Sequence, residues 1–229
     1  DVYKRQAQMY TSKLVTREEK NRLLGFIPMF ISGVLFFGIF QQQFTVMTIY
    51  SDVRLDRHMF GWEIPPSLVQ SINPIFIVIF SAVFATMWTK LGDRQWSTPV
   101  KFGAANIVIG ISLFFFLPFS GAEANSTPMF VIVFILFLFT MAELLLSPVG
   151  KALATKVAPV AFPSRMMAVW MMAVAMGTSL AGSLASFYNP DDAGAENTFF
   201  ISLGVVSIVL GAILLVLSRW VVKKFSTFR

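Results

Sequence analysis

Residues 124–150 read ANSTPMFVIVFILFLFTMAELLLSPVG and contain one charged side chain, that of Glu143. An α-helix needs about 20 apolar residues to cross roughly 30 Å of hydrocarbon, and this run is longer than that. Its apolar side chains cover every face, whereas the strands of a β-barrel alternate apolar and polar residues. The stretch therefore predicts a transmembrane helix.

Five further stretches of comparable length carry no charge. They cover residues 23–51, 64–89, 102–122, 166–190 and 197–218. With the first stretch, they predict an all-α membrane protein with six transmembrane helices embedded in the lipid bilayer. We expect the spans at residues 24–50, 66–89, 102–119, 127–150, 166–188 and 197–218, none of which contains Lys or Arg.

The overall composition agrees with a membrane protein and excludes several kinds of site. The 229 residues are 56% hydrophobic and 13% charged, against about 45–50% and about 25% in an ordinary globular domain. With no cysteine and only His58, thiol nucleophiles, Cys- or His-rich metal sites and a Ser-His-Asp triad are excluded or nearly so. We expect no metal and no cofactor. The chain begins with Asp1, which is compatible with a fragment of a longer protein.

The basic residues predict the orientation in the membrane. Of 18 Lys and Arg residues, only Arg54 and Arg57 fall on one side of the six expected spans. Because Lys and Arg concentrate in cytoplasmic loops, we expect both termini to be cytoplasmic. The chain then divides into a cytoplasmic linker at 1–23, a six-helix transmembrane bundle at 24–222 and a cytoplasmic tail at 223–229. The net charge of +6 is then a topology signal, and no nucleic-acid partner is expected.

The linker has one structural signal of its own. Thr16-Arg17-Glu18-Glu19 has the spacing of a helix capping box. It predicts a short cytoplasmic helix leading into the first span. The alternative is a solvated basic segment with no role beyond topology.

The six spans divide into two sets of three, at about residues 24–119 and 127–222. An odd number of crossings in each set gives the two sets opposite orientations. This is the arrangement of inverted-topology repeats in transporters.

Glu143 is the most informative polar residue, because an ionised carboxylate at membrane depth costs at least about 2.5–3.5 kcal/mol. It can be protonated, or it can pair with a cation that these spans do not supply. A substrate amine or another part of the protein could provide that cation. The alternative is a neutral carboxyl group that bonds a neighbouring helix and serves packing alone.

Other polar residues at membrane depth have a functional and a structural interpretation each. Ser147 lies one helical turn beyond Glu143 and on the same face, but Ser-Pro in a membrane helix is often only a kink. Gln70 and Asn73 share a face, although Asn73 could simply bond backbone groups that Pro74 leaves free. Trp170, near the start of its span, would ordinarily be an interfacial anchor.

An amide run lies late in the first span. Gln41, Gln42 and Gln43 are consecutive, so at least one of the three must face the protein interior.

Several of these segments resemble one family in order and spacing. Glu143-Leu-Leu-Leu-Ser-Pro-Val-Gly150 is followed by Thr-Lys-Val-Ala-Pro at 155–159 and by Met-Met-Ala-Val-Trp at 166–170. Ile-Pro-Pro-Ser begins the second span at 64–67, and Phe-Phe-Gly-Ile-Phe-Gln-Gln lies in the first at 36–42. These blocks resemble the proton-dependent oligopeptide transporters of the major facilitator superfamily.

The resemblance implies an architecture and a function. It implies one six-helix bundle, built from two inverted three-helix repeats, of a twelve-helix transporter whose N-terminal six-helix bundle is missing here. The whole would import di- and tripeptides with protons by alternating access. Asn73 and Glu143 would hold the peptide α-amine, and Glu143 would also couple protons. Further substrate contacts are expected from Ser147, Trp170, Phe37, Gln41 and Gln70.

Two positions depart from the family pattern. Phe37 stands where the family usually has Trp, and Gln41 stands where it usually has a Glu that pairs across the extracellular gate. An ion pair at Gln41 is therefore not available to close that gate.

Three other functions fit these residues less well than peptide import does. A relative that carries nitrate or another small solute is disfavoured, because a lone acid at mid-membrane suits an amine better. A non-transporting scaffold would not need Glu143, Asn73 and Trp170 near one cavity. A membrane enzyme is a poor fit, because a single carboxylate lacks a second acid, a nucleophile or a metal ligand.

Overall fold

The computed structural model describes residues 15–59 and 61–225 and contains six helical segments that are long and apolar enough to cross a membrane. The all-α, six-span fold class is therefore confirmed. Residues 1–14 and 226–229, which hold most of the expected linker and tail, lie outside the described residues. The segments, in chain order, are α2 (Arg17–Phe40) with η1 (Gln41–Phe44) and α3 (Val46–Val53), α4 (Pro66–Val69) with α5 (Ile72–Leu91) and η2 (Gly92–Arg94), α6 (Thr98–Phe114) with η3 (Leu117–Phe119), α7 (Met129–Val157), α8 (Pro163–Ala185) and α9 (Ala193–Lys224).

The first segment starts at the expected capping box. The Thr16 hydroxyl accepts a hydrogen bond from the Glu19 amide (3.3 Å), and the Glu19 carboxylate accepts one from the Thr16 amide (2.8 Å). Glu19 also accepts a bond from the Val160 amide between α7 and α8 (2.9 Å). The helix that starts at Arg17 continues without a break to Phe40, so the short helix expected before the first span and the span itself are one element.

The first span breaks at its amide run. Helix α2 ends at Phe40 and the chain passes through the 3₁₀ turn η1 before α3 begins. Gln42 is buried at this break and its amide donates to the carbonyls of Gly38 and Ala181, both at 3.1 Å. A side-chain amide of this kind bonds backbone oxygens that a broken helix leaves exposed. The prediction that one of the three glutamines faces the interior is confirmed, because Gln43 is buried as well.

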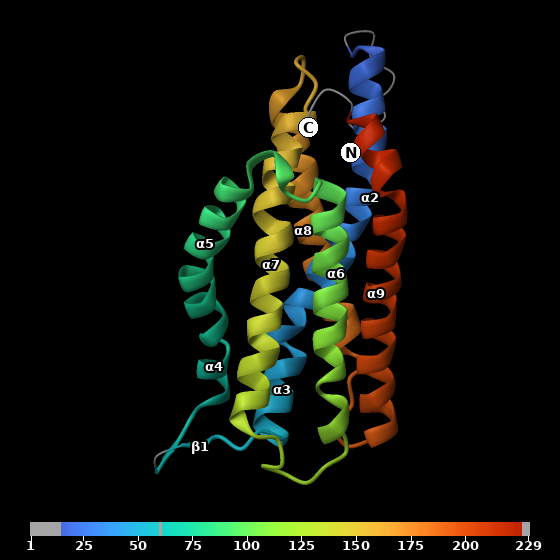
Figure 1. Cartoon of the computed structure of the whole chain (residues 1–229). Helices are drawn as coiled ribbons and strands as arrows, with labels where there is room; N and C mark the ends of the chain where they lie inside the picture. The colour runs from blue at the N-terminus through green and yellow to red at the C-terminus, as the bar shows by residue number, and fades with distance from the viewer. Residues whose placement is uncertain (1–14, 60, 226–229) are drawn as a thin grey trace.

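Helices α6 and α9 pack side by side (Figure 1). Gly103 lies opposite Gly211, and Gly110 lies opposite Gly204 two turns along, so close that a Cβ at Gly110 would stand 2.7 Å from the Gly204 carbonyl oxygen. Small residues allow such approach of helix backbones in membranes. Asn106 of α6 donates to the Ser32 hydroxyl (2.8 Å) and thereby ties this pair to α2.

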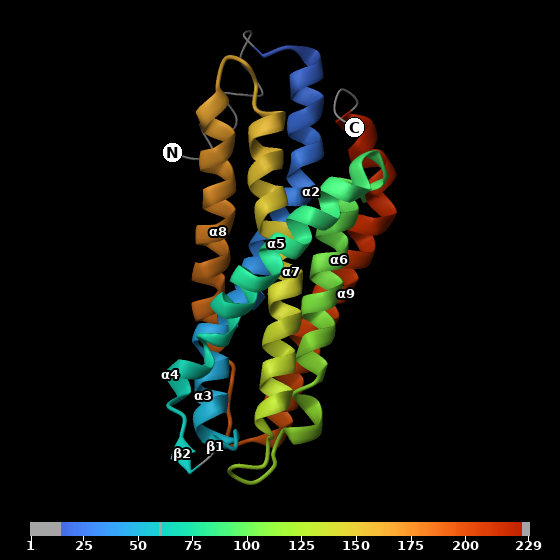
Figure 2. The same ribbon diagram turned by 60° about the vertical axis from the view of Figure 1, so that its left-hand side comes forward.

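Helix α5 lies apart from the other long helices. It stands at the left edge in Figure 1 and crosses in front of α7 in Figure 2. Phe76 and Phe80 pack edge-to-face against Phe137 of α7, with ring centroids 5.8 and 5.3 Å apart. Most of its other side chains are exposed, and Val78 is 75% exposed. Helix α5 therefore packs on the bundle through one side and leaves most of its other side chains exposed.

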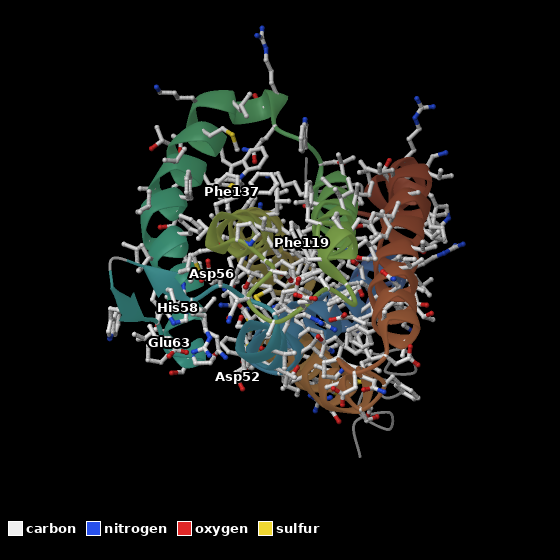
Figure 3. All side chains as sticks on the ribbon, turned by 90° about the horizontal axis from the view of Figure 1, so that it is seen from below. Asp52, Asp56, His58, Glu63, Phe119 and Phe137 are labelled. Carbon is white, nitrogen blue, oxygen red and sulfur yellow. The ribbon has the colours of Figure 1, made fainter. Side chains whose placement is uncertain are left out.

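The two ends of the bundle differ in their charges. The start of α2 and the end of α9 lie together, where the Lys224 ammonium is 3.4 Å from the Asn21 amide oxygen. The opposite end carries the antiparallel hairpin of β1 (His58–Met59) and β2 (Trp62–Glu63). Figure 3, viewed from that end, shows Asp52, Asp56 and Glu63 around the hairpin. The acidic residues around the hairpin and the basic residues at the start of α2 and the end of α9 thus occupy opposite ends of the bundle.

Candidate functional site

Asn73 lies where three helical elements meet. It is in the first turn of α5 and is 3% exposed. Its amide nitrogen donates to the Gln43 side-chain oxygen on η1 (2.8 Å), and its amide oxygen accepts from the Thr140 hydroxyl on α7 (2.6 Å). These bonds join η1, α5 and α7 at a point inside the bundle.

Glu143 is the acidic member of this site. It lies three residues beyond Thr140, on the same face of α7, and the Asn73 amide is an interaction partner of its carboxylate. One carboxylate oxygen, Oε2, is buried without a hydrogen-bond partner. Among the described residues, no basic side chain forms an ion pair with it. A buried acceptor without a partner fits a group that arrives from outside the bundle.

Helix α7 is longer than the expected span 127–150, since it continues to Val157. Lys151 is therefore on the same helix as Glu143, eight residues further on, and acts on its carboxylate only through long-range electrostatic attraction. Lys151 is exposed to solvent.

Trp170 is in the core of the bundle and is 0% exposed. Its ring packs edge-to-face against Phe37 (6.1 Å) and Phe102 (5.8 Å), and its indole nitrogen has no hydrogen-bond partner. The interfacial-anchor interpretation of this tryptophan is therefore wrong. The ring rests against Gly150, two turns beyond Glu143 on the same face of α7.

The remaining candidates make contacts of their own. The Gln41 amide donates to the Thr178 hydroxyl on α8 at 3.0 Å. Gln70, at the end of α4, bonds the Thr48 hydroxyl on α3. Ser147 is half-buried on α7. The structure thus brings Asn73 to Glu143 and Phe37 to Trp170, whereas Gln41 and Gln70 bond threonines instead of other candidates.

Sequence reasoning did not assign Gln43 and Thr140 to the site. Both are 0% exposed. Thr140 could have been found from its position three residues before Glu143, because that spacing places the two side chains on one helix face. Gln43 could not be separated from its two neighbouring glutamines without knowing where the helix breaks.

Glu196 is a buried acid away from Glu143. It is 0% exposed at the hairpin end of the bundle. Its carboxylate accepts from the Tyr188 hydroxyl (2.8 Å), the Ser120 hydroxyl and the Gly121 amide (both 2.9 Å), and it pairs with Arg54 (3.4 Å). Burial, and then this neighbouring carboxylate, raise the pKa of Tyr188, so the phenol stays protonated and donates. Because Glu196 is fully bonded, it stabilises the loops and has no free oxygen for a ligand.

Comparison with known proteins gives one family throughout. The profile described as "POT family" (PTR2) matches residues 2–214. The chain is 40% identical over 212 residues to "Uncharacterized transporter YclF" of Bacillus subtilis (strain 168), a match that covers 92% of this chain and 42% of the relative. It is 37% identical over 229 residues to the "Di-/tripeptide transporter" of Lactococcus lactis subsp. cremoris, covering 96% of this chain and 45% of the relative.

Solved structures agree with these matches. A structure of "peptide transporter POT in complex with sulfate" superposes with a TM-score of 0.89 at 33% identity, covering 97% of this chain and 45% of that one. A "POT family transporter in complex with 5-aminolevulinic acid" gives a TM-score of 0.87 at 34% identity, covering 96% of this chain and 46% of that one. The chain therefore spans less than half the length of each of these four proteins.

Proposed function

This chain belongs to the POT family, and we propose that it forms the second six-helix bundle of a transporter that imports di- and tripeptides together with protons. The proposed partner is an N-terminal six-helix bundle, against which this one rocks in alternating access. Two findings support this division: the coverage of 45% of a di-/tripeptide transporter and the superposition on 45% of a solved peptide transporter.

The unpartnered Glu143 carboxylate oxygen carries the proposal. An ammonium group supplies only hydrogen-bond donors and a positive charge, which are what a buried carboxylate beside an amide can bind. Di- and tripeptides with a free N-terminus carry this group. We therefore assign the α-amine of the peptide to Glu143 and Asn73.

The other candidates take supporting roles in the proposal. In the complete transporter, Ser147 and Gln41 would line the peptide site, and Gln70 would border it from the end of α4. Phe37 and Trp170 form the aromatic wall behind Glu143, in line with their contact with each other and with Gly150.

Proton coupling follows from the same carboxylate. The negative charge of the Glu143 carboxylate would be compensated at different stages of transport by a proton, by a basic side chain of the first bundle or by the peptide ammonium group. Whichever species binds displaces another, so proton occupancy and peptide occupancy are linked.

The orientation proposed is cytoplasmic for both chain termini, in the cell membrane. The start of α2, with Arg17 and Lys20, and the end of α9, with Lys223 and Lys224, lie together at one end of the bundle, and acidic residues surround the hairpin at the other (Figures 1 and 3). This is the charge distribution of the positive-inside rule.

The test is uptake by the complete two-bundle transporter that contains this chain, reconstituted in liposomes. We expect labelled Ala-Ala to accumulate when the outside is acidic, and a protonophore to abolish the accumulation. Labelled nitrate should not accumulate under the same gradient. Nitrate uptake without dipeptide uptake would replace the proposal with an anion carrier, and uptake of neither would leave the scaffold interpretation.

A further inference from the structure

Asn73 is the only buried residue of helix α5. The other residues of this helix, nearly all of them apolar, are partly or largely exposed, as is Ile75 at 57%. In a membrane-spanning helix, apolar side chains can face lipid, whereas polar ones face the protein interior. Asn73 therefore marks the side of α5 that meets the bundle, where its hydrogen bonds add to the packing of Phe76 and Phe80 against Phe137.

The Asn73 amide is held at both ends. The Gln43 oxygen accepts from its nitrogen, and the Thr140 hydroxyl donates to its oxygen. The Thr140 hydrogen is shared with the Leu136 carbonyl, 2.9 Å away. With an acceptor at one end and a donor at the other, one orientation of the amide is favoured.

This orientation determines what faces Glu143. An amide nitrogen carries two hydrogens, and Gln43 takes one of them. The other is available to the Glu143 carboxylate, which interacts with the Asn73 amide. Thr140 and Glu143 lie three residues apart on α7, so the amide is held by the same helix face that carries the acid.

Packing alone does not explain a glutamine at position 43. Its side chain is 0% exposed, and its own amide nitrogen has no hydrogen-bond partner. A buried donor without a partner destabilises a protein, and an apolar side chain of similar size would avoid that cost. The bond that Gln43 makes to Asn73 is what an apolar residue could not supply.

We propose that Gln43 and Thr140 are positioning residues of the ammonium site: they fix the Asn73 amide so that it and Glu143 bind the peptide amine together. The inference rests on the proposed peptide transport. Gln43 and Thr140 are completely buried, so they act through Asn73 and make no contact with substrate.

The experiment measures Ala-Ala uptake by the complete transporter and its Thr140→Val, Thr140→Ser, Gln43→Leu and Asn73→Leu variants. Thr140→Val keeps the shape of the side chain and removes the hydroxyl, whereas Thr140→Ser keeps the hydroxyl. Thr86→Val is the matched control, because the Thr86 hydroxyl bonds only the backbone of its own helix, at the Ala82 carbonyl (2.8 Å). Thermal unfolding in detergent checks that each variant is folded.

We expect Thr140→Val and Gln43→Leu each to raise KM about ten-fold with kcat changed less than about two-fold, because ground-state binding is weakened. Thr140→Ser should restore KM, and Thr86→Val should not change it. In the Asn73→Leu background, Thr140→Val should add less than about two-fold, since coupled residues are not additive.

Three results would overturn the inference. Full additivity of Thr140→Val and Asn73→Leu would show that Thr140 acts independently of Asn73. An equal rise of KM in Thr140→Ser and Thr140→Val would show that the hydroxyl is not what matters. An unchanged KM in both Thr140→Val and Gln43→Leu would show that neither residue positions the amide. Either result would refute the inference and leave the proposed transport intact. Absence of dipeptide uptake by the wild type would instead refute the proposed function, and this inference with it.

Discussion

The indole ring of Trp170 lies against the backbone of Gly150, and a side chain at position 150 would occupy the same space as the ring. Helices α7 and α8 are therefore as close here as the tryptophan allows. Gly150 is two helical turns beyond Glu143, so this contact also sets the wall of the candidate site. Gly33 of α2 borders the other side of the ring, where a Cβ would stand 3.1 Å from it.

Gly150→Ala should destabilise the bundle by about 1–3 kcal/mol, because the added methyl group overpacks a buried ring. The measurement is thermal unfolding in detergent. Gly182→Ala is the matched control: Gly182 lies in α8, and nothing is within 4 Å of its Cβ position. That substitution should leave stability unchanged or raise it slightly, because alanine favours a helix. Equal melting temperatures for the two variants would contradict the close packing at Trp170.

Glu196→Gln should destabilise the hairpin end strongly. The substitution removes the charge that compensates buried Arg54 and sets a new amide donor among groups that already donate. Breaking a buried ion pair costs about 3–5 kcal/mol. Glu63→Gln is the control, because the Arg57–Glu63 pair (2.9 Å) has a carboxylate that is 54% exposed and an exposed pair contributes about 0–1 kcal/mol. A small effect of Glu196→Gln would mean that Arg54 is compensated in another way.

The six spans and the start of the first helix could be predicted from the sequence because each depends on neighbouring residues alone. Each run without charge was long enough to span a bilayer, and the cap at Thr16 and Glu19 depends only on local spacing. Glu143 and Asn73 could be proposed because polar groups at membrane depth are costly and therefore rare. The proximity of Glu143 and Asn73 depends on how α5 crosses α7, and this crossing cannot be predicted from a local sequence pattern.

Tertiary packing decided the features that were missed or misjudged. Glu196 lies among loop charges in the sequence, and only the return of three loops to one place buries it. Trp170 has the position of an interfacial anchor in its span, but the glycines at 33 and 150 open a space for it inside the bundle. Gln43 became distinguishable only when the break at η1 was known.

Single cysteines should report the orientation, since the chain has no native cysteine. We expect cysteines at Asp56, Glu123 and Asp191 to react with an impermeant thiol reagent in intact cells, and cysteines at Gln95 and Ala161 to react only after the membrane is opened. All five positions are exposed. Asp191 is preferable to its neighbour Asp192, whose carboxylate caps α9. The reverse pattern of labelling would invert the proposed topology.

The isolated 229-residue chain should not transport peptides. Alternating access needs two bundles that move around a site between them, and α5, with most of its surface exposed, lacks that partner. We expect the purified chain to self-associate in detergent and to show no Ala-Ala uptake in liposomes, whereas co-expression with an N-terminal bundle should restore uptake. Proton-dependent uptake by the chain alone would show that this bundle forms a complete transporter by itself.

Glu143→Gln tests the ammonium site in the complete transporter. The substitution preserves size and hydrogen bonding but removes the negative charge that compensates a proton or an amine. We expect loss of proton-driven Ala-Ala accumulation. We also expect binding of Ala-Ala to weaken far more than binding of N-acetyl-Ala-Ala, which has no ammonium group. Leaving one member of a buried charge pair uncompensated costs about 3–5 kcal/mol, so the loss for the free amine should be large.

Two measurements separate this role from a structural one: accumulation under an imposed proton gradient, and binding of both dipeptides to wild type and variant. A carboxylate needed only for packing would, when replaced, weaken both ligands equally and leave accumulation by the folded fraction unchanged. A carboxylate that binds the amine must distinguish the two ligands, because only one of them carries the charge. If Glu143→Gln selectively weakens the binding of Ala-Ala and leaves the melting temperature unchanged, Glu143 therefore binds the ammonium group.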